Sequence, residues 1–130
     1  MEETKKKPSL YSPLVLAYIG DGVYELFVRN RVISENENLP ANKLHKTVIK
    51  YVSASAQAKS ITEISEFLTE DEMAVFKRGR NAKSYTSPKN AEIGDYRKAT
   101  GFEALLGYLY FLGDTERLDE IMSLAYQRAL

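Results

Sequence analysis

The chain has 130 residues, of which 44% are hydrophobic and 28% charged, and its formal net charge is zero. This composition is typical of one globular domain with a core of its own. The absence of cysteine excludes disulfides, thiolate zinc sites and iron–sulfur clusters. No apolar run reaches the roughly 20 residues that span a bilayer, and the N-terminus does not resemble a secretory signal. We therefore expect a cytoplasmic protein without a membrane partner.

Helix signals begin near the N-terminus. Ser12 and Pro13 combine a side-chain cap with a proline that fits the first helical turn, and they predict a helix from residue 14 to about residue 33. This helix is apolar on most of its sides, so we expect it to lie at the centre of the fold. Pro40 precedes a second predicted helix that ends near residue 51.

Similar signals continue through the middle of the chain. A third helix is expected over residues 53–67, with small residues along one face. Thr69 and Glu72 form a capping-box pattern at the start of a fourth helix. Gly79 is predicted to end that helix, because glycine commonly terminates helices.

The last third of the chain is expected to contain an irregular segment and two more helices. Turn residues dominate residues 80–94, a fifth helix is predicted from about residue 96 to 112, and Asp114 caps a sixth. No alternating strand pattern of useful length interrupts the helices. The sequence therefore predicts a single all-α domain.

Charge is distributed unevenly along this neutral chain. From Lys77 to Lys98 there are seven basic and two acidic residues, a net charge of +5. A basic segment of this kind suits a surface that binds phosphate groups. A solvated charged loop explains the charge pattern equally well.

A carboxylate interrupts the most apolar predicted helix. Asp21 lies between Gly20 and Gly22, and Glu25 follows one turn later on the same side of the helix. An acidic side chain there is unfavourable unless a positive group compensates it, and the glycines indicate close approach of another backbone. The alternative is a structural aspartate that hydrogen-bonds a neighbouring helix.

The fifth predicted helix repeats this pattern. Glu103 is surrounded by apolar residues, with Gly101 and Gly107 nearby. If the first and fifth helices cross, the two carboxylates would repel one another unless a cation lies between them. Oxygen ligands without nearby histidine or cysteine favour Mg²⁺, with Mn²⁺ as a substitute.

These residues carry a resemblance to the ribonuclease III family, and more closely to its Mini-III ribonucleases. The similarity extends from about residue 14 to residue 124. The matching stretches are Ile19-Gly20-Asp21-Gly22-Val23-Tyr24-Glu25-Leu26, Val52-Ser53-Ala54 with Gln57-Ala58, Phe76-Lys77-Arg78-Gly79-Arg80-Asn81-Ala82-Lys83-Ser84, and Phe102-Glu103-Ala104-Leu105-Leu106-Gly107.

The resemblance implies an endoribonuclease domain over residues 12–130, preceded by an N-terminal tail of residues 1–11. It implies that Asp21 and Glu103 are catalytic residues that bind Mg²⁺. Ala17 and Thr100 stand where the larger family has two further acidic residues, which leaves open whether one or two ions act.

The resemblance also implies a substrate and an assembly. Such an enzyme would cleave double-stranded RNA as a homodimer, leave 5′-phosphate ends, and act in the maturation of precursor 23S (large-subunit) ribosomal RNA. Whether a ribosomal protein takes part stays open. The expected RNA-binding residues are Arg78, Arg80, Asn81, Lys83 and Ser84. His45, the single histidine, is interpreted as a surface or RNA-facing residue rather than a catalyst.

Two other classes of function remain as alternatives. One is a non-catalytic helical module that binds RNA or protein, in which Asp21 and Glu103 are structural. The other is a helical metal-dependent enzyme that acts on small nucleotides. Steep salt dependence of binding favours a duplex ligand over a small nucleotide, and metal-dependent cleavage separates an enzyme from a scaffold.

Overall fold

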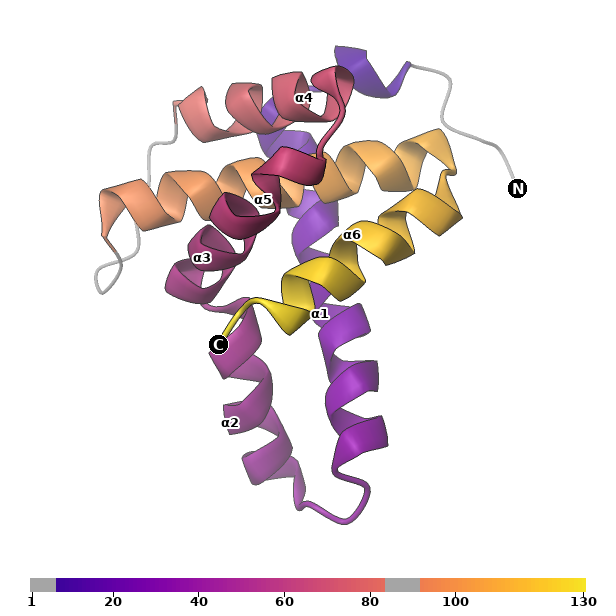
Figure 1. The fold of residues 1–130 in the computed structure, drawn as a ribbon, viewed down its shortest axis with the longest axis vertical. Helices are drawn as coiled ribbons and strands as arrows, with labels where there is room; N and C mark the ends of the chain where they lie inside the picture. Colours follow the sequence, from indigo (N-terminus) through magenta and orange to yellow (C-terminus); the bar gives the residue numbers. More distant parts are fainter. Residues whose placement is uncertain (1–6, 84–91) are drawn as a thin grey trace.

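The structure is a computed structural model that describes residues 7–83 and 92–130. In these residues it contains helices and no strand, which confirms the all-α prediction (Figure 1). The elements are η1 (Pro8–Leu10), α1 (Pro13–Glu35), α2 (Ala41–Val52), α3 (Ala54–Ile64), η2 (Ser65–Phe67), α4 (Glu70–Asn81), α5 (Ile93–Leu112) and α6 (Thr115–Gln127).

The predicted helix starts are confirmed by their capping hydrogen bonds. The Ser12 hydroxyl accepts a hydrogen bond from the backbone N–H of the second residue of α1, and the Asp114 carboxylate accepts one from the third residue of α6. Thr69 and Glu72 form the reciprocal capping box at the start of α4. Gly113 ends α5 in the left-handed region, with φ 76°, which glycine adopts without steric penalty.

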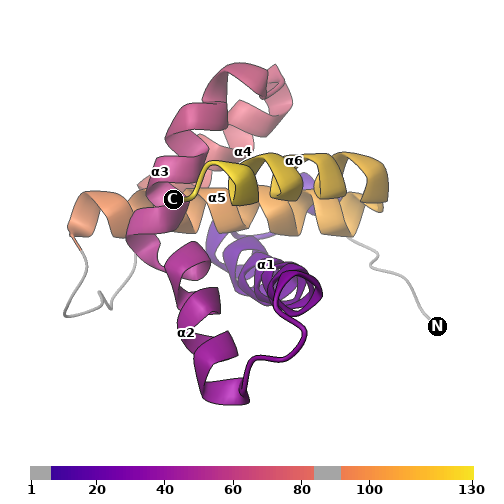
Figure 2. The same cartoon turned by 60° about the horizontal axis from the view of Figure 1, so that its bottom comes forward.

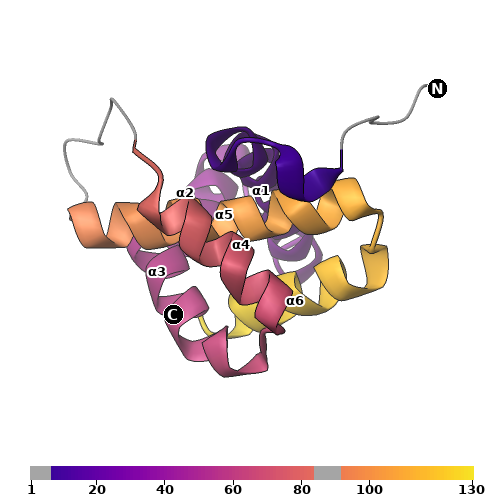
Figure 3. The ribbon, with the colours of Figure 1, turned by 90° about the horizontal axis from the view of Figure 1, so that it is seen from above.

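Helix α5 lies at the centre of the fold. Helix α1 crosses it on one side, while α4 and α6 lie on the other (Figures 2 and 3). The prediction that α1 would be the central helix is wrong. Val15, Tyr18 and Leu26 of α1 are 47%, 83% and 62% exposed. The apolar residues of α1 therefore cover the core with one face and leave a second apolar face on the surface.

Glycines allow α1 and α5 to cross at very short range. A β-carbon on Gly20 would overlap the backbone carbonyl of Glu103, and one on Gly107 would overlap the backbone carbonyl of Leu16. The close backbone approach that the sequence predicted is thus present at both positions. The same prediction is wrong for Gly22, which has open space where a β-carbon would stand and takes no part in the crossing.

A second close crossing joins α4 to α5. A β-carbon on Gly79 would lie 2.7 Å from the β-carbon of Ala104, and one on Gly101 would lie 2.6 Å from the backbone oxygen of Phe76. The prediction that Gly79 ends its helix is wrong, because α4 continues to Asn81. Gly79 is buried inside the helix, where the absence of a side chain serves packing.

The second half of α1 and all of α2 form an antiparallel hairpin that extends from the rest of the molecule (Figure 1). On the opposite side of α5, the Arg117 guanidinium of α6 donates to both carboxylate oxygens of Glu72 in α4 and lowers the pKa of that carboxyl.

Within residues 7–83 and 92–130, no helix is both long and apolar enough to cross a membrane.

Candidate active site

The crossing of α1 and α5 brings Asp21 and Glu103 together. Asp21 directly follows Gly20, whose close packing against the backbone of Glu103 sets the distance between the helices. The two carboxyl groups lie close enough for one to donate a hydrogen bond to the other when it holds a proton. Asp21 is exposed and Glu103 is half-buried, so the pair lies where the α1–α5 crossing reaches the protein surface.

Burial governs the protonation of Glu103. It raises the pKa of the Glu103 carboxyl to about 9, and the neighbouring Asp21 carboxyl acts in the same direction. A hydrogen bond from Gln57 opposes the shift by favouring the charged form. At neutral pH in the absence of a cation, Glu103 therefore keeps its proton. A cation at this position would have to displace that proton.

Gln57 of α3 is a member of the site that the sequence did not assign. Its side-chain Nε2 donates to Glu103 Oε2 at 3.2 Å and to the backbone oxygen of Val52 at 3.0 Å. The residue is 2% exposed. The sequence placed Gln57-Ala58 within a family-like stretch but gave the amide no partner. The missing information was the position of α3 against α5.

The oxygen atoms at the crossing suit a magnesium ion. Mg²⁺ is commonly held by one or two carboxylates and completes its shell with water and substrate phosphate. Asp21 and Glu103 supply two such carboxylates, and Asp21 faces an open depression of about 370 Å³. Across the described residues, no group of three or more histidine, cysteine, aspartate or glutamate side chains could hold a metal ion. Within this part of the chain, the candidate ligands at the crossing are thus a carboxylate pair.

Neighbouring positions add no further acid to this pair. Ala17 is buried, and the Thr100 hydroxyl donates to the backbone oxygen of Tyr96 within its own helix at 2.9 Å. Glu25, one turn after Asp21, accepts hydrogen bonds from Arg29 at 2.6 and 2.9 Å. Arg29 therefore compensates the charge of Glu25 at the edge of the depression.

Four of the five expected RNA-binding residues lie at or just after the end of α4. Arg80 is held over the Phe76 ring at 5.6 Å and donates to the Asn81 side chain, while Lys83 is exposed. Arg78 donates to the backbone oxygens of Ser9 and Tyr11, so it also ties the segment before α1 to α4. The fifth expected contact, Ser84, lies outside the described residues.

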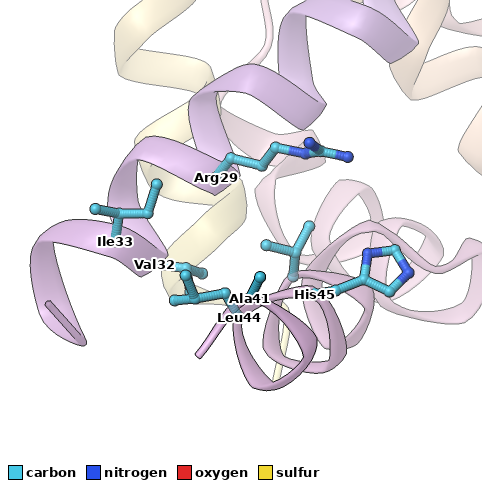
Figure 4. Close-up of a pocket in the computed structure, with 7 residues that line it drawn as sticks. Arg29, Val32, Ile33, Ala41, Leu44 and His45 are labelled. Carbon is cyan, nitrogen blue, oxygen red and sulfur yellow. The ribbon is translucent and has the colours of Figure 1, made fainter. Parts of the chain in front are cut away.

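His45 lies on α2 and is not among the residues that line the depression beside Asp21. It lines a small pocket of about 180 Å³ with Arg29 and apolar residues of α1 and α2 (Figure 4). Its side chain is exposed, in agreement with the interpretation of His45 as a surface residue.

A larger apolar groove lies on the exposed face of α1. Its volume is about 520 Å³, and its walls come from α1, α5 and α6. The lining residues are Ile19, Gly22, Val23, Leu26, Phe27, Asn30, Leu109, Tyr110, Gly113, Thr115, Leu118 and Met122. A contiguous apolar surface of this kind commonly marks an interaction site.

Comparisons with known proteins identify the family of this arrangement. The model of the ribonuclease III domain matches residues 14–114. A Mini-ribonuclease 3 from Clostridium tetani is 58% identical over 95% of this chain and 82% of its own. Another, from a Thermoanaerobacter species, is 52% identical over 95% of this chain and 87% of its own.

The chain belongs to the ribonuclease III family, in its Mini-ribonuclease 3 group. It is accordingly an endoribonuclease. A crystal structure of a Fusobacterium nucleatum protein shares this ribonuclease III fold with a TM-score of 0.83. That protein is 28% identical, and the match covers 97% of this chain and all of the other.

Proposed function

We propose that the chain is a Mg²⁺-dependent endoribonuclease that cleaves double-stranded RNA as a homodimer and leaves 5′-phosphate ends. The observation that carries this proposal is the Asp21–Glu103 pair, because two carboxylates that share a partly buried site need a cation to be charged together. Family membership supports the same reaction class.

In this proposal the carboxylates bind the metal ion, and the depression beside them accommodates the RNA. Asp21 and Glu103 would hold the ion on one side and leave the open depression beside Asp21 for RNA phosphate. When bound, Mg²⁺ supplies Lewis-acid chemistry that neutralises charge on the phosphate and lowers the pKa of water. The close backbone packing at Gly20 and Gly107 would limit how far the two carboxylates can move apart. Glu25, already paired with Arg29, is not assigned as a base.

The basic end of α4 would hold the RNA backbone. Duplex RNA is recognised mainly through its phosphates and 2′-hydroxyls, which suits cationic and amide side chains. Arg80 is pre-oriented by Phe76, and Asn81 and Lys83 follow it. Ser84 remains part of the proposal on sequence grounds. Arg78 already has backbone partners, so its substitution would also loosen the N-terminal segment.

The role of α4 in RNA binding can be tested with matched charge changes. We expect the double variant Arg80→Gln/Lys83→Gln to bind duplex RNA more weakly than the wild type. The slope of its salt dependence should be smaller by about one unit for each cation that no longer binds a phosphate. Lys43→Gln/Lys46→Gln removes the same charge from α2 and serves as control. If the two double variants lose RNA affinity equally, the RNA-binding surface is not specifically at the end of α4.

Cleavage itself is the decisive test of the proposed function. Long double-stranded RNA should be shortened in the presence of Mg²⁺, and a chelator should stop the reaction. Asp21→Asn should abolish cleavage while circular dichroism and oligomeric state stay unchanged. A protein that binds RNA without metal-dependent cleavage would instead be a non-catalytic binding module. A protein that cleaves only small nucleotides would be a metal-dependent enzyme of nucleotide metabolism rather than a ribonuclease.

The biological substrate and the chain division are finer parts of the proposal. We propose precursor 23S ribosomal RNA as the substrate, which would place the enzyme in the cytoplasm where ribosomes assemble. Processing of a precursor transcript by the purified protein, with and without large-subunit ribosomal proteins, would test both the substrate and the need for a protein partner. The proposed division into a tail (residues 1–11) and a catalytic domain (12–130) can be tested by deleting residues 1–11, which should preserve cleavage although Arg78 loses its partners Ser9 and Tyr11.

A further inference from the structure

The side-chain nitrogen of Gln57 links the break between α2 and α3 to the Glu103 carboxyl group. Ser53 is the single residue between α2 and α3, and its hydroxyl caps α3 by accepting the N–H of Ala56. Val52 ends α2, and the last carbonyls of a helix have no partner within it. The Gln57 side chain donates to this Val52 carbonyl.

The orientation of the Gln57 amide follows from these partners. One Nε2 hydrogen goes to Val52 and the other to Glu103 Oε2. Turning the amide over would place its oxygen against the Val52 carbonyl, which can only accept a hydrogen bond. The backbone of the α2–α3 break thus fixes the direction in which Gln57 presents its second hydrogen to Glu103.

The arrangement leaves an unfavourable group in the core. Gln57 Oε1 is buried, and the described residues provide no hydrogen-bond donor for it. A buried acceptor without a donor destabilises the folded state. An apolar side chain of similar length would avoid this loss, which indicates that Gln57 serves the carboxylate rather than the core.

We propose that Gln57 is a positioning residue that holds the Glu103 carboxylate in the orientation in which it binds the metal ion together with Asp21. This inference rests on the proposed function. Gln57 acts through Glu103 and does not itself touch substrate. A carboxylate on a half-buried side chain can rotate about its last bonds. A fixed donor on Oε2 restricts this rotation and leaves Oε1 available for an ion shared with Asp21. Partners that orient metal ligands in this way strongly affect metal affinity.

The test measures metal binding without RNA. Gln57→Met keeps the length of the side chain and removes both donors. We expect calorimetric titration with Mn²⁺, or electron paramagnetic resonance of free Mn²⁺, to show affinity about 10- to 100-fold lower than in the wild type. Cleavage should require correspondingly more metal and recover much of its rate at saturating metal. Wild-type affinity in a folded Gln57→Met protein would overturn the proposal.

Two further variants guard against a purely structural explanation. Ser60→Ala removes another buried hydrogen bond of α3, from the Ser60 hydroxyl to the backbone oxygen of Ala125 at 2.8 Å. It should lower the melting temperature and leave Mn²⁺ affinity unchanged. Gln57→Asn keeps an amide that is too short to reach both partners, and it should lose affinity as Gln57→Met does. It replaces the methionine variant should that one fail to fold, and wild-type affinity in Gln57→Asn would equally overturn the proposal.

Glu103→Gln separates a failure of this inference from a failure of the proposed function. Loss of Mn²⁺ binding in Glu103→Gln with normal binding in both Gln57 variants would overturn the role of Gln57 alone. Normal binding in Glu103→Gln would remove Glu103 from the metal site, and the proposed function and the inference would fail together.

Discussion

Glu103 holds a carboxyl group in surroundings that disfavour its charge. Burial and the nearby Asp21 raise its pKa to about 9 from an ordinary value of 4.5. Between these two values the folded protein keeps a proton that the unfolded chain has released. The folded state therefore loses stability relative to the unfolded state as pH rises through this range.

We predict that Glu103→Gln stabilises the metal-free protein. Glutamine preserves the size of the side chain and has no proton to lose. The variant should match the wild type near pH 4 and become progressively more stable than it up to about pH 9. At pH 8 its melting temperature should be higher by at least about 3 °C, the shift that roughly 1 kcal/mol produces in a domain of this size. Equal melting curves across the pH range would contradict the raised pKa of Glu103.

The same proton predicts how metal binding depends on pH. Because Mg²⁺ must displace the proton of Glu103, its affinity should rise about tenfold per pH unit between pH 7 and pH 9 and level off above. Calorimetry in two buffers of different ionisation enthalpy should show about one proton released per ion. The Glu103→Gln variant, with no such proton, should bind weakly at every pH. Affinity that does not change with pH would exclude a proton shared at the pair.

The residues of the site differ in how far the sequence could reveal them. Asp21 and Glu103 stand out because a charged residue in an apolar helix is rare and unfavourable. Gln57 has no such contrast with its neighbours. Its role depends on the helix break at Ser53 and on the approach of α3 to α5, and both are tertiary features. The sequence also could not show that Arg78 has backbone partners in the N-terminal segment.

At the scale of the helices, the α1–α5 crossing sets the geometry of the pair. We predict that Gly107→Ala destabilises the protein by at least about 2 kcal/mol, since the added β-carbon would overlap the Leu16 carbonyl and force the helices apart. It should also weaken Mg²⁺ binding, because Asp21 and Glu103 would separate. Chemical denaturation and calorimetry measure the two effects.

Gly94 provides the matched control on the same helix. It is exposed, and a β-carbon there would meet open space. Gly94→Ala should leave stability unchanged or raise it by about 0.5 kcal/mol through the helix preference of alanine. Similar losses in Gly107→Ala and Gly94→Ala would mean that the crossing is not the constraint.

Local signals explain which helix boundaries were predictable. Ser12, the pair Thr69 and Glu72, and Asp114 act through hydrogen bonds to residues two or three positions away, so their meaning is contained in the sequence. A glycine is typical of a helix end, but Gly79 lies inside α4 and packs against Ala104, which is distant in the sequence. The error at Gly79 arose because glycine serves both purposes.

At the scale of the whole molecule, the main exposed apolar feature that we describe is the groove formed by α1, α5 and α6. Leu26 lines the α1 side of the groove at 62% exposed, and Tyr110 lines its α5 side at 49% exposed. The proposed homodimer would cover this surface, because a two-fold interface pairs the same patch on both subunits. It would also bring two carboxylate pairs into one assembly, one for each RNA strand.

We predict that Tyr110→Glu converts the protein to a monomer. A charge placed in a buried interface without a partner is strongly unfavourable, whereas on the free surface of α5 it is tolerated. Sedimentation velocity should show a dimer for the wild type and a monomer for the variant. Ile49→Glu is the matched control, since Ile49 is 46% exposed on α2 and lies outside the groove.

The monomer should still bind Mn²⁺, because Asp21 and Glu103 come from one chain. It should cut long duplex RNA poorly, because it presents one active site where the dimer presents two. A dimeric Tyr110→Glu protein would place the interface elsewhere, and a monomeric variant with full activity would show that a single carboxylate pair is sufficient.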